Sequence, residues 1–255
     1  MILVYDGSFG GWLTTVFEVY ERKLNSVQIC KDGTQANDIF LPLFHIATDA
    51  VKAKRVWKGL SQKLSSQGLD RMLYTFLSES KGIENLLMEY VRYVFSSKEN
   101  IEENHGHPVV LSVNQTAKKV GREKHRMEAF VRFSQLKDGL FYSAIEPDFN
   151  VLPLVMRHFK SRYADQDWLI YDLKRKYGIH YSKETAVCSE ITIDWQENPG
   201  NAAKQPGISH PEEKLYQLLW KDYFKSTGIA ARKNLKLHIQ HVPRRYWKYL
   251  TEKIY

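Results

Sequence analysis

The chain has 255 residues, of which 43% are hydrophobic, so it can bury a core as one large domain or as two ordinary ones. Its apolar runs are far shorter than the ~20 residues of a membrane-spanning helix, and its first residues lack a signal-peptide pattern, so we expect a cytoplasmic protein that does not enter a membrane. Two cysteines cannot form a disulfide framework or a cysteine-rich zinc site, and we expect no cofactor and no metal.

The formal net charge of +8 is unevenly distributed along the chain. Residues 221–255 carry nine basic and two acidic side chains, so this short segment supplies +7 of the total. A local excess of this kind favours binding to phosphates, or to an acidic protein, over a role in solubility. A solvated helix face without a partner is the alternative, because basic tails are common.

The N-terminal region is expected to be rich in helices. Residues 2–5 are typical of a short strand, and the apolar residues between positions 9 and 20 have helical spacing. Asp6 or Ser8 would cap this helix. Further apolar stripes at helical spacing lie within residues 48–121, and they predict the core of a helical region.

The hydrophobic period changes beyond residue 126 from helical to strand-like. We expect two strands, a helix and two more strands, over residues 130–133, 140–145, 151–163, 168–174 and 179–181. Asp138-Gly139 is a hairpin signal between the first two strands, and Tyr177-Gly178 would form the turn between the last two. This order predicts an antiparallel α+β unit.

The C-terminal region is expected to end in helices. Residues 209–212 form a capping box with a proline in the first turn, and Gly228 would end the helix that follows. The apolar face of this helix consists of Leu215, Leu218, Leu219, Trp220 and Tyr223. Pro243 would start a final helix. We therefore predict an α+β fold with a helix-rich region of residues 1–117 and a basic α+β region of residues 118–255.

Six segments resemble, in the same order, a bacterial family described as DNA metabolism or DNA repair proteins, whose characteristic domain has no assigned function. The segments are YDGSFGGWLTTVFEVYE (5–21), KKVGREKHRMEAFVRF (118–133), IEPDFNVLPLVMRHFKSRY (145–163), DWLIYDLKR (167–175), LWKDYF (219–224) and VPRRYWKYLTE (242–252). The resemblance implies a DNA-related role beside a radical S-adenosylmethionine (SAM) enzyme, because the genes of the family tend to neighbour one. It implies no catalytic residues, and the chain lacks the cysteine triplet that would bind an iron–sulfur cluster.

One pattern suggests a metal-dependent nuclease of the PD-(D/E)xK type. Asp148 precedes Asp172 and Lys174, which share one face of a strand, so two acids and a lysine could face a metal ion and a scissile phosphate. The helix expected between the two elements departs from the usual hairpin of such nucleases. The alternative is that Asp172 is buried, pairs with Arg175, Arg162 or a tyrosine, and orders the sheet.

Basic and aromatic side chains are interspersed in residues 157–181, a mixture that suits a polyanion with stackable bases. His158 and Arg162 share a helix face and could bind one phosphate, or they could be a capped structural pair. Two arginines directly after Pro243 would lie near a helix N-terminus, a favourable place for phosphate. The expected nucleic-acid contacts are Arg157, His158, Arg162, Arg175, Lys233, Arg244, Arg245, Tyr246 and Trp247.

From the sequence we therefore expect a DNA-binding accessory or repair protein that acts with a radical SAM partner. One alternative is a nuclease-like enzyme with Asp148, Asp172 and Lys174 as its catalytic residues. Another is a protein-interaction subunit whose basic tail binds an acidic partner. The sequence leaves open whether the protein is an enzyme.

Overall fold

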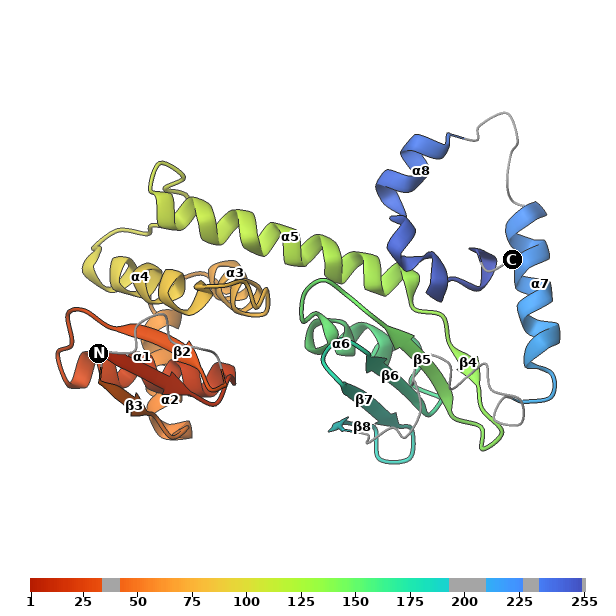
Figure 1. Ribbon diagram of the computed structural model, residues 1–255, viewed down its shortest axis with the longest axis horizontal. Coiled ribbons are helices and arrows are strands. Elements are labelled where there is room, and N and C mark those ends of the chain that lie inside the picture. The colour runs from red at the N-terminus through yellow and green to blue at the C-terminus, as the bar shows by residue number, and fades with distance from the viewer. Residues whose placement is uncertain (34–41, 193–209, 227–233, 254–255) are drawn as a thin grey trace. The chain divides into compact units, whose positions relative to one another are not determined.

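The computed structural model describes residues 1–33, 42–192, 210–226 and 234–253 (Figure 1). The chain divides into two compact units, residues 1–121 and residues 122–255, and the boundary falls within helix α5 (Pro108–Phe130). None of the helices in the described ranges is both long enough and apolar enough to cross a lipid bilayer.

Unit 1 is built on a three-stranded parallel sheet. Strand β1 (Ile2–Tyr5) is buried along its whole length, because it lies between β2 (Gln28–Lys31) and β3 (Leu43–His45) and pairs with both. Helix α1 (Phe9–Glu21) follows, and the Ser8 side chain caps its first turn. The strand and the capped helix that the sequence predicts here are both confirmed.

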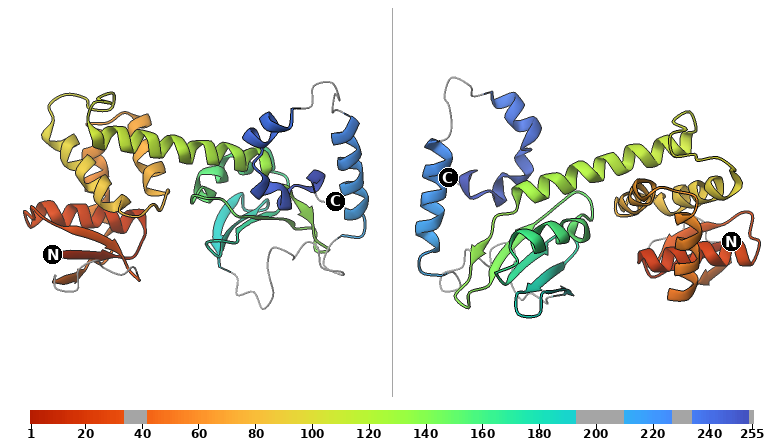
Figure 2. Two further views of the ribbon diagram at one scale, coloured as in Figure 1. Left: turned by 45° about the horizontal axis from the view of Figure 1, so that its top comes forward. Right: turned by 180° about the vertical axis from the view of Figure 1, so that it is seen from behind.

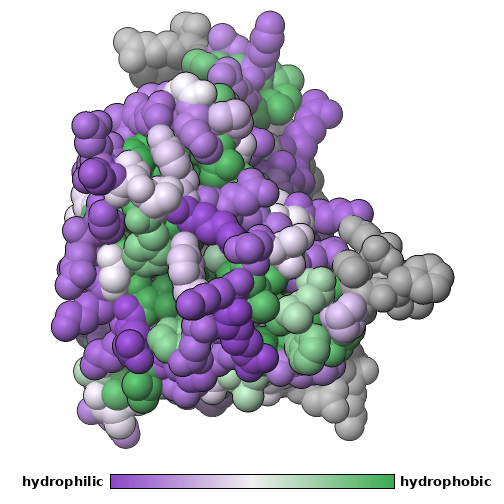
Figure 3. Space-filling view, turned by 90° about the vertical axis from the view of Figure 1, so that its left-hand side faces the viewer, coloured by the Kyte–Doolittle hydropathy of each residue, from purple (hydrophilic) through white to green (hydrophobic). Residues whose placement is uncertain are grey.

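Three shorter helices and the start of α5 complete unit 1: α2 (Ala50–Ser61), α3 (Ser66–Phe76) and α4 (Ile83–Ser96). Their buried faces are the apolar stripes of the sequence, and each contributes a side chain with no exposed surface: Leu60, Met72 and Leu87. The face of unit 1 in Figure 3 is mostly hydrophilic, with apolar side chains between the charged ones.

Unit 2 contains a five-stranded mixed sheet in the order β4-β5-β6-β7-β8. The strands are β4 (Ser134–Gln135), β5 (Phe141–Ile145), β6 (Trp168–Asp172), β7 (Tyr177–Ser182) and β8 (Val187–Ile191). Helix α6 (Leu152–Arg162) connects β5 to β6 and packs on one face of the sheet, where Phe159 meets Trp168 (Figures 1 and 2). Leu169 and Tyr171 project from the other face into a second apolar cluster, so both faces of β6 are buried.

The order of these elements agrees with the sequence, but the pairing of β5 with β6 does not. A helix between two neighbouring strands returns the chain to the same end of the sheet, so β5 and β6 run parallel and a wholly antiparallel unit is wrong. The strand expected at residues 130–133 is also wrong, because α5 continues through Phe130 and β4 is only two residues long.

The turn between β6 and β7 lies at residues 173–176, not at Tyr177-Gly178, which belong to β7. Lys176 adopts a left-handed backbone conformation with φ of 59°, and its N–H donates to the carbonyl oxygen of Asp172 at 2.8 Å. A side-chain cap from Asp172 closes this turn without a glycine, so the Gly178 signal in the sequence points to the wrong position.

The C-terminal elements of unit 2 are α7 (Glu213–Ser226), α8 (Leu235–His241) and two 3₁₀ segments, η3 (Arg244–Tyr249) and η4 (Thr251–Lys253). The final helix expected after Pro243 is therefore two 3₁₀ turns, because Leu250 leaves the helical region with φ of −95° and ψ of 111°. The expected cap residues Ser209 and Gly228 lie outside the described residues.

Helix α7 turns its apolar face toward solvent. The exposed fractions are 55% for Leu215, 59% for Leu218, 55% for Leu219 and 60% for Tyr223. On the opposite side of the helix, Glu213 is only 7% exposed, and its carboxylate accepts a hydrogen bond from the backbone N–H of Gln135 at 3.0 Å. Glu213 thus attaches the helix to β4 through a polar contact, and the apolar face is left exposed in the described part of the chain.

Candidate nucleic-acid interface

Asp172 organises the turn after β6 and is fully buried. Its Oδ1 accepts hydrogen bonds from the backbone N–H groups of Lys174 and Arg175 at 2.9 and 3.1 Å, and its Oδ2 accepts one from the Arg175 guanidinium at 2.9 Å. Burial raises the pKa of the Asp172 carboxyl, and the hydrogen bonds and charge of Arg175 oppose this increase. The prediction that Asp172 is buried and paired with a cation is confirmed, and its partner is Arg175.

The residues of the nuclease pattern lie close together, but they meet through the backbone of Asp148 and not through its carboxylate. The Lys174 ammonium and the Arg175 guanidinium donate to the carbonyl oxygen of Asp148 at 3.0 and 3.2 Å. The Asp148 carboxylate instead lies 2.6 Å from the guanidinium of Arg245. Within the described part of the chain, no three His, Cys, Asp or Glu side chains are grouped to hold a metal ion. A catalytic role for Asp148, Asp172 and Lys174 stays a prediction.

Asp148 also contacts a cluster around the buried Glu123. We call Glu123, Asp148, Arg245 and Tyr246 the Glu123 network. The Glu123 side chain is 1% exposed and accepts hydrogen bonds from the Tyr246 hydroxyl and, at 2.9 Å, from the backbone N–H of Asp148. The Arg245 guanidinium lies 3.5 Å from Glu123 and donates to the Tyr246 hydroxyl at 2.7 Å. Burial and the Glu123 carboxylate raise the pKa of Tyr246. This network fixes η3 to α5 and to the segment after β5.

Sequence reasoning misses Glu123, although a signal is present. Val120, Glu123 and Met127 follow one another at intervals of three and four residues on α5, and all three are buried. An acid on an apolar helical stripe needs a buried partner, and this spacing could have identified it.

A second pair of contacts ties η3 to the end of β5. The Lys248 ammonium lies 2.5 Å from the Glu146 carboxylate, and the Tyr249 hydroxyl donates to the same oxygen at 2.7 Å. These hydrogen bonds and the charge of Lys248 lower the pKa of Glu146. Lys248 and Arg245 are therefore already paired with acids of unit 2.

The other residues expected to bind nucleic acid at the C-terminal end differ in their surroundings. The exposed guanidinium of Arg244 lies 5.8 Å from the ring of Trp247, and it has no acidic partner among the described residues. The Trp247 indole is half-buried and donates to the carbonyl oxygen of Val242 at 3.0 Å. Lys233 lies outside the described residues.

Helix α6 carries cations that have no acidic partner in the described part of the chain. Leu152, Val155 and Phe159 are buried at helical spacing, so the residues between them face solvent. Three cations of this helix are exposed, Arg157 and Lys160 away from the sheet and Arg162 on the side of His158, and together we call them the α6 basic face. In the described part of the chain none of the three forms an ion pair or hydrogen bond with an acidic side chain.

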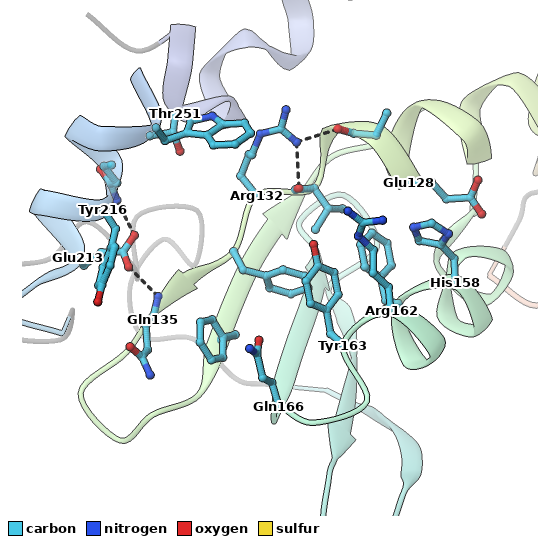
Figure 4. Close-up of a pocket in the computed structure, with 17 residues that line it drawn as sticks. Glu128, Arg132, Gln135, His158, Arg162, Tyr163, Gln166, Glu213, Tyr216 and Thr251 are labelled. Atoms are coloured by element: carbon cyan, nitrogen blue, oxygen red, sulfur yellow. Dashed lines mark hydrogen bonds between the residues drawn. The ribbon is translucent and has the colours of Figure 1, made fainter. Parts of the chain in front are cut away.

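A pocket of about 760 Å³ lies beside α6 (Figure 4). His158 and Arg162 both line it, so the prediction that these two side chains share a helix face is confirmed. Other parts of the lining come from the end of α5, from β4 and β5, and from α7 and η4. The pocket combines aromatic rings with amide and charged groups, and its volume is within the usual range for a small-ligand site.

The family model of a domain of unknown function, DUF4130, matches residues 81–252, and the chain belongs to this family. The matched region includes α6, the pocket and the Glu123 network. No curated protein sequence matches the chain. Among solved structures, the chain is similar to a pGpG-specific phosphodiesterase, PggH, from Vibrio cholerae, with 11% identity over 70% of this chain and 80% of that chain and a TM-score of 0.30. A TM-score this low supports no statement about the fold or the chemistry of this chain.

Proposed function

We propose that this protein binds nucleic acid through unit 2, with DNA as the first candidate. The observation that carries the proposal is the α6 basic face, which offers three exposed cations without acidic partners among the described residues, beside a pocket lined by aromatic rings. Phosphates can neutralise such cations without breaking an existing ion pair, and aromatic rings can stack on bases. Arg245 and Lys248, by contrast, would have to give up carboxylate partners to do the same.

The role we propose is that of an accessory or repair factor that holds DNA while a radical SAM partner supplies the chemistry. The resemblance of six segments to a DNA-related bacterial family supports this role. The contacts of the two candidate catalytic acids support it as well, because Asp148 and Asp172 each direct a carboxylate to an arginine.

The test is equilibrium binding of the full chain to labelled single-stranded, duplex and uracil-containing DNA between 50 and 200 mM salt. The informative variant is Arg157→Gln with Lys160→Gln, because these two cations do not line the pocket. For every phosphate that the variant no longer neutralises, the slope of log affinity against log salt should fall by about 0.7 for single strands and about 0.9 for duplex. The matched control removes the exposed Lys54 and Lys58 of α2 by Gln substitution and should leave the slope unchanged.

Two results would refute the proposal. The first is that the wild-type protein binds none of the three DNAs at 50 mM salt. The second is that the α6 pair and the α2 pair change the slope equally, which would show that only net charge matters. Circular dichroism of both variants establishes that the fold is retained.

A second candidate function is favoured by the exposed apolar face of α7, which suits a protein-interaction subunit. A partner that covers Leu215 and Leu219 would remove apolar surface from water. The partner to test by calorimetric titration is a purified radical SAM protein of the kind that the resemblance implies. Leu219→Glu should weaken that binding, whereas Leu111→Glu, at a 40% exposed leucine of unit 1, should not.

A further inference from the structure

The aromatic side of the pocket is held in place before any ligand arrives. The ring of Phe133 lies 5.4 Å from the ring of Tyr163 at an interplanar angle of 75°, and 5.8 Å from the ring of Phe159 at 85°. Phe159 is itself buried in the contact between α6 and the sheet. A flat ligand entering here would meet rings that do not have to reorganise, which lowers the entropic cost of binding.

Two charged groups of the pocket are already paired with nearby side chains. Glu128 is bound to Lys124 at 2.7 Å, and Arg132 is bound to Glu252 at 2.9 Å. Glu213 accepts a backbone hydrogen bond from β4. Glu128 and Arg132 therefore offer no free charge to a ligand, whereas Glu213 accepts only from the neutral Gln135 backbone and Gln217 amide among the described residues.

The polar groups left for a ligand include two side-chain amides, two basic side chains and the hydroxyls of Tyr163 and Thr251. The side-chain amides of Gln135 and Gln166 form no hydrogen bond within the described part of the chain, and Figure 4 shows the Gln166 amide directed into the pocket below Tyr163. Arg162 and His158 lie on the α6 side, and neither has an acidic partner among the described residues. A ligand that satisfies all of these groups needs a flat ring, a polar edge and an anionic group.

We infer that the pocket accepts a single unstacked base of a nucleic acid strand, with its ring against Phe133 and Tyr163, its polar edge on Gln166 and its adjoining phosphate on Arg162. This inference rests on the proposed function and adds that the bound nucleic acid is single-stranded. A base within duplex DNA has its edge paired and both of its faces stacked, so it cannot enter the pocket unless it leaves the double helix. The strand then continues along Arg157 and Lys160, outside the pocket.

The test compares three probes of equal length: single-stranded DNA, duplex DNA and a single strand in which every nucleotide is abasic. The abasic strand keeps the phosphates but has no base to insert. Base stacking contributes enough that the ordinary single strand should bind roughly ten- to a hundred-fold more tightly than the abasic strand. Duplex DNA should bind with an affinity close to that of the abasic strand.

The variant that isolates the pocket is Gln166→Leu, which keeps side-chain size and removes the amide. It should weaken binding of the ordinary single strand by about ten-fold, as expected when a two-point interaction with a base edge is removed, and leave the abasic strand unaffected. Gln115→Leu, at an exposed glutamine of α5, is the matched control and should behave as wild type. Arg157→Gln with Lys160→Gln should weaken binding of all three probes.

The outcomes distinguish failure of the base pocket from failure of nucleic-acid binding. If the ordinary and abasic strands bind equally and Gln166→Leu changes nothing, the pocket does not hold a base, although unit 2 still binds phosphates. If none of the probes binds, nucleic-acid binding itself is refuted. A ten-fold or larger loss on the ordinary strand alone in Gln166→Leu supports the pocket directly.

Discussion

The ion pair between Asp172 and Arg175 gives the sharpest test of how unit 2 is held together. The Asp172 side chain has no exposed surface, and the Arg175 side chain is 9% exposed. Arg175 also donates to the carbonyl oxygen of Pro147 at 3.2 Å, so the pair links the turn after β6 to the segment after β5. Removing Asp172 therefore breaks two backbone hydrogen bonds and leaves a buried guanidinium without its charge partner.

The expected loss of stability follows from this arrangement. Removing one member of a buried ion pair costs about 3–5 kcal/mol, mostly because the remaining charge is uncompensated. Asp172→Ala should therefore lower the free energy of unfolding by about 3–5 kcal/mol. Asp172→Asn should lose less, because its amide oxygen can still accept from the backbone. Asp165→Ala, at an exposed acid on the loop before β6, should stay within about 0.5 kcal/mol of wild type.

The complementary variant Arg175→Met adds a pH dependence. Without the guanidinium, burial would hold the pKa of Asp172 above that of an unfolded chain, which is about 3.9. A carboxyl whose pKa is raised in the folded protein stabilises the fold at pH values below its pKa in the unfolded chain. This stabilisation is lost as pH rises through the pKa of the folded protein. The deficit of Arg175→Met relative to wild type should therefore be larger at pH 7 than at pH 4. Urea unfolding at both pH values measures it, and an equal deficit, or a loss below 1 kcal/mol in Asp172→Ala, would refute this reasoning.

Three further predictions concern η3 and catalysis. Tyr246→Phe removes the hydroxyl that donates to Glu123 and should cost about 1–3 kcal/mol in urea unfolding, because a buried carboxylate loses a donor. Lys248 lowers the pKa of Glu146 in the folded protein. The contribution of this ion pair to stability is therefore present above about pH 4.5 and is lost as pH falls further. Glu146→Gln should make the free energy of unfolding depend less on pH in this acid range. The isolated chain should show no turnover on plain DNA with magnesium or manganese, and metal-dependent cleavage that disappears in Lys174→Ala would contradict this.

The parts of the fold that follow from local pattern are predicted well. The strand at residues 2–5, the helix capped by Ser8 and the helix over residues 151–163 all show their period within a dozen residues. The placement of His158 and Arg162 on one face of α6 follows from the same helical period. Local spacing is sufficient because each of these features depends on neighbours in the chain.

The parts that depend on distant partners are not predicted. The direction of β6 relative to β5 is decided by the crossover through α6, and the orientation of α7 is decided by contacts such as that of Glu213 with Gln135. The apolar spacing of α7 is visible in the sequence, but spacing alone does not say which face packs. The pocket is likewise assembled from segments more than 100 residues apart, between α5 and η4.

The distribution of charge shows most clearly why counting residues is not enough. Residues 221–255 carry most of the net positive charge, and yet Arg245 and Lys248 lie against Asp148 and Glu146. Attraction for a polyanion depends on the charge that remains after such pairing, because paired groups must first be separated. Residues 118–220, which include α6, carry 16 basic and 14 acidic side chains. By this criterion α6 nevertheless offers more to a phosphate backbone than η3 does. The salt dependence of the α6 variants therefore tests the proposed interface more directly than removal of the basic C-terminal segment.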